Sequence, residues 1–131
     1  MQTIANTPNY MLAVDPSKNR IYWTPNGLWD KTMSAPELVG NWEKARQRVL
    51  SGFTILVDAR QIKTLSAEWA DTFEQIQELM VTSGLMASAE VLPEDAITKM
   101  QAKRVARQSG MRREVFASVE EAEKWLNSLR T

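Results

Sequence analysis

After residue 50 the chain repeats one unit, an apolar run of strand length followed by an amphipathic helix that ends at a glycine. The clearest copy starts with Phe53 to Val57, continues through a helical apolar stripe from Trp69 to Met80, and stops at Gly84. Phe53 to Val57 shows no polar alternation, which is typical of a strand covered on both faces. The repeat predicts an α/β fold in which helices pack on a central sheet.

The same unit returns twice in weaker form. Two further strand and helix pairs are predicted, a strand at 85–91 with a helix at 93–109 and a strand at 113–116 with a helix at 118–129. Ser34 with Glu37, and Ser118 with Glu121, have the spacing of capping boxes. The first box predicts a helix that begins at Ser34 and ends near Gly52.

The chain is expected to contain an antiparallel hairpin near its start. The two strands, 10–14 and 21–24, are rich in β-favouring residues, and the turn residues of 15–19 separate them. Residues 1–9 are expected to form a loosely ordered N-terminal segment.

A bend at 25–27 leaves two interpretations of Leu28 and Trp29. They extend the second strand around a bulge, which we favour, or they anchor a loop. Trp23 and Trp29 can line an apolar pocket, pair two copies of the domain, or fill the end of the core. Helical phase assigns the other three tryptophans to the core.

Residues 1–131 are therefore predicted to fold as a single α/β domain. The element order β-β-α-β-α-β-α-β-α predicts a mixed sheet, an N-terminal hairpin followed by parallel strands, with about four helices packed on it. The chain has no Cys and no His, so thiolate and imidazole chemistry is excluded. We expect no metal, no cofactor and no catalytic residue.

Charge and hydropathy restrict the partners. Lys plus Arg number 16 and Asp plus Glu number 16, so the neutral chain lacks a long-range field that attracts nucleic acid. The first residues lack a basic segment followed by an apolar stretch, and no run reaches the ~20 apolar residues that span a bilayer. We expect a cytoplasmic protein with no nucleic-acid partner and no membrane insertion.

The chain resembles the STAS superfamily, the fold of bacterial anti-sigma-factor antagonists, and in particular its SpoIIAA-like branch. The resemblance spans Tyr10 to Leu129 and rests on the element order and three local pieces. These pieces are Trp29 after Gly27, the strand 52–58, and the ending 115–126. The resemblance implies a STAS-like fold and a regulatory role, and it brings no catalytic fingerprint.

Regulatory members of the superfamily are phosphorylated by a partner kinase on a Ser of an Asp-Ser-Ser/Thr-Gly segment that opens a helix. The corresponding stretch here has Ala67 or Glu68 in place of the phosphoacceptor and Trp69 in place of the Gly. Ser66 is the hydroxyl left at the helix start. It is either an N-cap or a phosphosite, because a helix N-terminus also favours an anion.

Asp58 ends the predicted central strand, at the sheet edge where open α/β sheets place ligands. Together with Arg60, Lys63 and Thr64 of the loop expected to follow, it forms a candidate binding site. The alternative is that Asp58 accepts backbone N–H groups in its turn while the basic residues face solvent.

A second candidate surface is basic. Lys99, Lys103 and Arg107 are spaced four apart and share one face of the helix predicted at 93–109, and no acid occurs from 97 to 113. An acidic partner or an anionic surface would fit there. The alternative is a solvated helix face.

These features together predict a non-catalytic regulatory or adaptor module that recognises a protein partner, with homodimerisation left open. The alternative is a protein that binds a small apolar or lipid-like ligand between sheet and helices, since SpoIIAA-like proteins share their architecture with the CRAL-TRIO lipid-binding group.

Overall fold

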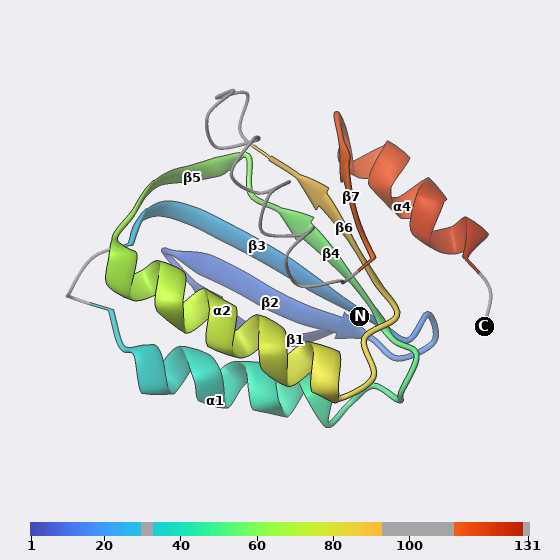
Figure 1. The fold of residues 1–131 in the computed structure, drawn as a ribbon, viewed down its shortest axis with the longest axis horizontal. Helices are drawn as coiled ribbons and strands as arrows, with labels where there is room; N and C mark the ends of the chain where they lie inside the picture. Colours follow the sequence, from blue (N-terminus) through green and yellow to red (C-terminus); the bar gives the residue numbers. More distant parts are fainter. Residues whose placement is uncertain (30–32, 93–111, 130–131) are drawn as a thin grey trace.

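The computed structural model describes residues 1–29, 33–92 and 112–129, which form a mixed sheet with helices on both faces (Figure 1). The sheet has seven strands: β1 (Gln2–Thr7), β2 (Tyr10–Asp15), β3 (Arg20–Trp29), β4 (Thr54–Asp58), β5 (Gln61–Leu65), β6 (Ala87–Val91) and β7 (Arg113–Phe116). The helices of the described part are α1 (Ala35–Arg46), α2 (Ala67–Thr82) and α4 (Val119–Ser128). The helix predicted at 93–109 lies outside the described residues. The predicted α/β class with a mixed sheet is confirmed.

The strand order is β1-β2-β3-β4-β6-β7, and β5 also pairs with β3. β1, β2 and β3 are antiparallel neighbours, which short hairpin connections allow. β4 runs parallel to β3, and β6 and β7 continue in the same direction. The expected pattern of a hairpin followed by parallel strands is confirmed.

On the side away from β2, strand β3 pairs with two further strands in succession. Residues 20–23 pair with β4 and residues 26–29 pair with β5. A register shift falls between Gly27 and Leu28, and Gly27 has φ +69°, a left-handed conformation that glycine adopts without strain. The extension of the second strand through Trp29 is confirmed, and the loop interpretation is wrong.

Two segments that we expected to be irregular are strands. Residues 1–9, expected to be loosely ordered, contain β1, and residues 61–65, expected in the loop after Asp58, form β5. Both are short and largely polar, so their own sequences give a weak strand signal. β2 and the far half of β3 supply their hydrogen-bond partners. Pairing with an existing strand therefore decided both segments.

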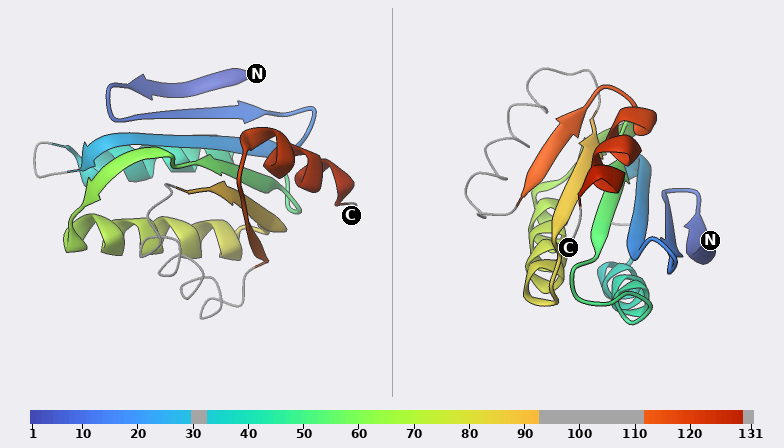
Figure 2. Two further views of the ribbon diagram at one scale, coloured as in Figure 1. Left: turned by 90° about the horizontal axis from the view of Figure 1, so that it is seen from above. Right: turned by 90° about the vertical axis from the view of Figure 1, so that its right-hand side faces the viewer.

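Helices α1 and α2 cover one face of the sheet, and α4 covers the opposite face (Figure 2). One hydrophobic cluster contains Trp42 of α1 and Met80 of α2, and a second contains Leu126 of α4. Because side chains alternate along a strand, Ile55 of β4 joins the first cluster and Leu56 joins the second. The predicted central strand is therefore packed on both faces.

Serine side chains cap the helices of the described part. Ser34, Ser66 and Ser118 accept hydrogen bonds from the backbone N–H three residues on, at 3.2, 3.4 and 3.2 Å. Each bond satisfies a donor that the first helical turn leaves without a partner. All three predicted caps are confirmed.

Helix α1 ends at Arg46, earlier than the predicted end near Gly52. Asn19, in the turn between β2 and β3, holds the chain at Leu50: its Oδ1 accepts from the backbone N–H of Leu50 at 2.7 Å, and its Nδ2 donates to the carbonyl of Leu50 at 3.0 Å. This tertiary contact draws residue 50 out of the helix path.

Candidate functional site

A polar network joins the start of β3 to helix α4. Oε1 of Glu123 on α4 accepts hydrogen bonds from the hydroxyl of Tyr22 at 2.6 Å and from Nζ of Lys18 at 2.9 Å. Oε2 of Glu123 lies 2.9 Å from Nη1 of Arg20. We call Lys18, Arg20, Tyr22 and Glu123 the β3–α4 network. One carboxylate thus holds three side chains from the other end of the sequence.

Arg20 is the most deeply buried charge of this network, with 3% of the residue exposed. A buried guanidinium is costly unless its donors are satisfied. Nε of Arg20 donates to Thr54 at 3.0 Å, and Nη1 donates to Asn127 at 3.1 Å. Since Thr54 starts β4 and Asn127 belongs to α4, Arg20 connects three elements.

The network changes the pKa of two of its members. Burial, with the hydrogen bond to Glu123, raises the pKa of Tyr22 to about 12. Burial also raises the pKa of Glu123, but the hydrogen bonds from Tyr22 and Lys18 and the charges of Arg20 and Lys18 lower it by more, so it lies below its ordinary value. At neutral pH Tyr22 therefore donates and Glu123 accepts.

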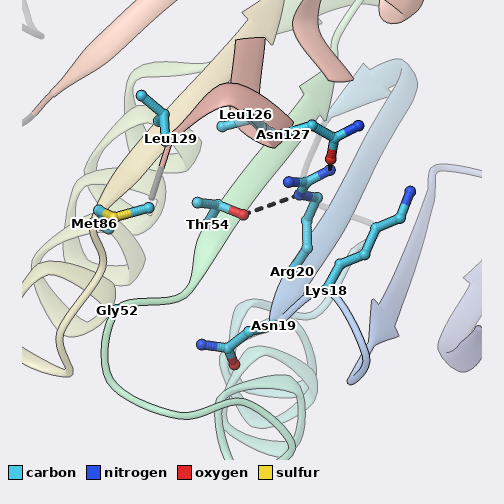
Figure 3. Close-up of a pocket in the computed structure, with 9 residues that line it drawn as sticks. All are labelled: Lys18, Asn19, Arg20, Gly52, Thr54, Met86, Leu126, Asn127 and Leu129. Atoms are coloured by element: carbon cyan, nitrogen blue, oxygen red, sulfur yellow. Dashed lines mark hydrogen bonds between the residues drawn. The ribbon is translucent and has the colours of Figure 1, made fainter. Parts of the chain in front are cut away.

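A cavity of about 370 Å³ opens beside the network, where β3 and β4 begin and α4 ends (Figure 3). We call it the α4 cavity. Lys18 and Arg20 give it a cationic wall, while Met86, Leu126 and Leu129 form an apolar wall on the side away from Lys18 (Figure 3). Its described lining includes no carboxylate, and Glu123 of the network is not a lining residue. The cavity can therefore accept negative charge at one wall and apolar surface at the other.

Sequence reasoning missed this cavity. The sequence placed a candidate binding site at the carboxyl end of β4, whereas the cavity lies at the amino end, where Thr54 begins the strand. Lys18 and Asn19 were assigned to a turn, and Glu123 and Asn127 were given no role in the terminal helix. The one available signal was the four-residue spacing of Glu123 and Asn127, which places both on one helix face. That spacing does not identify a partner about a hundred positions away.

The structure brings together two of the four residues of the candidate site at Asp58. Arg60 donates from Nε and Nη2 to the two carboxylate oxygens of Asp58, each at 2.8 Å, and its backbone N–H donates to Oδ1 at 3.3 Å. The Arg60 side chain thereby lowers the pKa of Asp58. Lys63 and Thr64 lie on β5 rather than in a loop, and Lys63 is exposed. The carboxylate of Asp58 is thus occupied by its own turn.

The other two candidates differ in what the structure shows. Ser66 is exposed and caps α2, so its capping role is confirmed, and its phosphorylation stays a prediction. Lys99, Lys103 and Arg107 lie outside the described residues, as does the surface that they were expected to form.

Trp23 and Trp29 fill the core, with 7% and 1% of each residue exposed. The ring centroid of Trp23 lies 5.2 Å from that of Trp42, and the centroid of Trp29 lies 5.0 Å from that of Trp69. Phe73 packs edge-on against both Trp23 and Trp29. Of the three interpretations of Trp23 and Trp29, core filling is the one confirmed.

A second buried ion pair holds the edge strand β7 to β6. Arg113 pairs with Glu90, of which 3% is exposed. Burial lowers the pKa of Arg113 to about 10. Glu90 lies within the buried strand β6, and the sequence pattern predicted a strand at 85–91 without assigning a role to this charge.

No protein-family model and no curated protein sequence matches this chain. The function must therefore be inferred from the chain's own residues. Within the described residues, none of the helices has the length and apolar character to cross a bilayer. In the same residues no group of three or more acidic side chains is arranged to hold a metal ion.

Proposed function

We propose that this chain is a non-catalytic regulatory or adaptor module of STAS-like fold that recognises a protein partner along the free edge of β1. The observation that carries the proposal is this edge: among the described strands, β1 pairs with β2 alone and ends the sheet. A free edge strand presents backbone groups that can pair with an extended segment of another chain.

The composition of β1 supports this role. Edge strands are commonly protected by charges or Pro, yet residues 1–14 contain no charged side chain, and Pro8 lies in the turn after the strand. A register shift between Thr3 and Ala5 is the one irregularity of the pairing between β1 and β2. The edge therefore has little that prevents strand addition.

Contacts near β1 also favour a protein segment. Ile4 and Ala5 are partly buried against the first hydrophobic cluster, so an added strand would extend existing apolar packing. Nη1 of Arg48, in the turn after α1, donates to Oε1 of Gln2 at 2.7 Å, which places a cation beside the start of the edge. An extended segment with an acidic residue at that point has a matching charge.

The pKa shifts of three carboxylates favour a binding role for these groups over a role as general acids. Asp15, Asp58 and Glu123 all have a pKa below the ordinary value, through hydrogen bonds from Ser17, from Arg60, and from Tyr22 and Lys18. A general acid at neutral pH needs a raised carboxyl pKa instead.

The STAS-like assignment is supported by the order of a hairpin followed by parallel strands. Cytoplasmic location remains part of the proposal.

Affinity purification from the native host tests the edge. Thr3→Lys and Asn6→Lys add a charge at exposed positions of β1, and Gln75→Lys adds the same charge at an exposed position of α2 as a control. We expect a stoichiometric protein to co-purify with the wild type and with Gln75→Lys and to be lost from both edge variants. A partner retained by the edge variants would contradict the proposal. If the wild type is a homodimer that Thr3→Lys or Asn6→Lys dissociates, the partner at the β1 edge is a second copy of this chain.

A second candidate function has one specific observation in its favour. The alternative of a small apolar or lipid-like ligand needs a space between sheet and helices, and the α4 cavity lies there with an apolar wall of Met86, Leu126 and Leu129. Native mass spectrometry of the purified protein tests this function. A co-purifying small molecule is expected, and a protein that carries none and binds no apolar probe would remove it.

A further inference from the structure

From the α4 cavity we infer that the ligand of this chain is a small amphipathic anion, a carboxylate that carries a short apolar tail. This inference rests on the second candidate function and adds to it the charge of the ligand. The cavity of about 370 Å³ falls within the range of small-molecule sites, ~300–1,000 Å³.

The charges around the cavity favour an anion. Its described lining carries two cations, Lys18 and Arg20, and no acid. Behind that wall Glu123 supplies one negative charge to both of them, so the network keeps one excess positive charge. Asp15, near the same turn, accepts hydrogen bonds from Ser17 instead. An anion in the cavity would offset the excess charge.

Hydrogen-bond donors remain on the polar wall. Nζ of Lys18 makes one bond to Glu123, and an ammonium group has three donors. The hydroxyl of Thr54 accepts from Arg20, so its own proton is available to a ligand. Arg20 is buried and fixed by Thr54, Asn127 and Glu123, which makes this wall pre-organised.

The opposite wall determines the rest of the ligand. Met86 and Leu129 are half-buried and Leu126 is buried, and the three lie on the side of the cavity away from Lys18 (Figure 3). An inorganic anion would leave this surface in contact with water, whereas an alkyl or aryl group would cover it. A carboxylate with a short tail satisfies both walls together.

Isothermal titration calorimetry of the full chain tests the inference with octanoate, octanol and inorganic phosphate. Octanoate supplies both parts of the ligand, octanol keeps the tail without the charge, and phosphate keeps a charge without the tail. We expect octanoate to bind at least about tenfold more tightly than either of the others. Its affinity is expected to fall as salt rises, because the cationic wall is partly exposed.

Matched variants locate the binding. Lys18→Gln removes a charge from the cavity, and Lys124→Gln removes one from an exposed position of α4 outside it. We expect about tenfold weaker octanoate binding for Lys18→Gln and unchanged binding for Lys124→Gln. Leu129→Trp fills the apolar side and is expected to abolish binding, with circular dichroism reporting that each variant is folded.

The outcomes separate the inference from the function on which it rests. If octanol binds as tightly as octanoate and Lys18→Gln has no effect, the inferred charge of the ligand is wrong and the apolar-ligand function stands. If phosphate matches octanoate, the amphipathic class is wrong. If no probe binds with a Kd below about 10 mM, or if Leu129→Trp binds octanoate like the wild type, the cavity is not the site. The inference and the apolar-ligand function are then both overturned.

Discussion

Tyr22 on β3 and Glu123 on α4 are 101 positions apart in the chain and share a hydrogen bond of 2.6 Å. The bond holds the middle of the last helix against the second half of the N-terminal hairpin. Leu126, one turn further along α4, packs in the second hydrophobic cluster and lines the α4 cavity. The bond between Tyr22 and Glu123 therefore helps to fix the helix that forms one side of that cavity.

Removing this hydrogen bond should lower stability in a pH-dependent way. The pKa of Tyr22 in the folded chain, about 12, exceeds the ordinary value of 10.0. The folded state therefore holds the proton more tightly, and this contribution to the unfolding free energy is lost as pH rises from about 10 through 12. Tyr22→Phe should cost about 1 kcal/mol at neutral pH and remove the tyrosinate absorbance step near pH 12. An unchanged alkaline titration would contradict this assignment.

Glu123 should make the protein sensitive to acid. The pKa of Glu123 in the folded chain lies below the ordinary 4.5. Its contribution to the free energy of unfolding is therefore fully present above pH 4.5 and is lost as pH falls through the pKa of the folded state. We expect urea unfolding of Glu123→Gln to show a smaller loss of stability between neutral and acid pH than the wild type. Glu121→Gln, at an exposed position of the same helix, controls for the loss of one carboxylate. Parallel profiles for Glu123→Gln and the wild type would be inconsistent with the network.

Two glycines should respond in opposite ways to alanine. Gly84 has φ +102°, and an added Cβ would meet the side chain and Cα of Ser51, so Gly84→Ala should lose more than about 1 kcal/mol of stability. Gly40 lies within α1 with open space at its Cβ position, so Gly40→Ala should gain roughly 0.5–1 kcal/mol from helix propensity. Chemical denaturation of both variants checks the pair, and equal effects would refute it.

The alternation of side chains along β3 predicts a contrast between neighbours. Trp29 is 1% exposed in the aromatic core, whereas Leu28 is 56% exposed. Trp29→Ala should cost about 3–5 kcal/mol, and Leu28→Ala should change stability by less than about 0.5 kcal/mol. Thermal unfolding measures both, with Trp29→Phe as the milder variant if Trp29→Ala does not fold. A larger loss at Leu28 than at Trp29 would show that the strand has the other register.

Much of the fold could be predicted because it depends on local patterns. The central strand, the capping serines and the apolar stripe of α2 follow from residue types at fixed spacings. β1 and β5 could not be predicted in the same way, since their residues form strands through pairing with β2 and β3. The helix α1 also stops short of the predicted end near Gly52, where a distant residue, Asn19, binds the backbone of Leu50.

The candidate sites were predicted less well than the fold. Asp58 was correctly placed at the end of β4, but its neighbour Arg60 occupies the carboxylate. The α4 cavity was missed because its walls come from distant segments. Its cationic wall comes from the turn before β3 and the first residue of β3, and its apolar wall comes from the chain before β6 and from the end of α4. Such a site has no spacing in the sequence to recognise.

The sequence by itself determined the alternation of apolar runs and capped helices, the absence of Cys and His, and the burial of β4 on both faces, because each depends on residue type and period. Only the tertiary structure decided which polar residues meet. Lys18, Arg20 and Tyr22 lie about a hundred positions from Glu123, and they come together because α4 packs its apolar side on the face of β4 and β6. The physical reason is that hydrophobic burial orients the helix and brings its polar side to partners that local sequence does not specify.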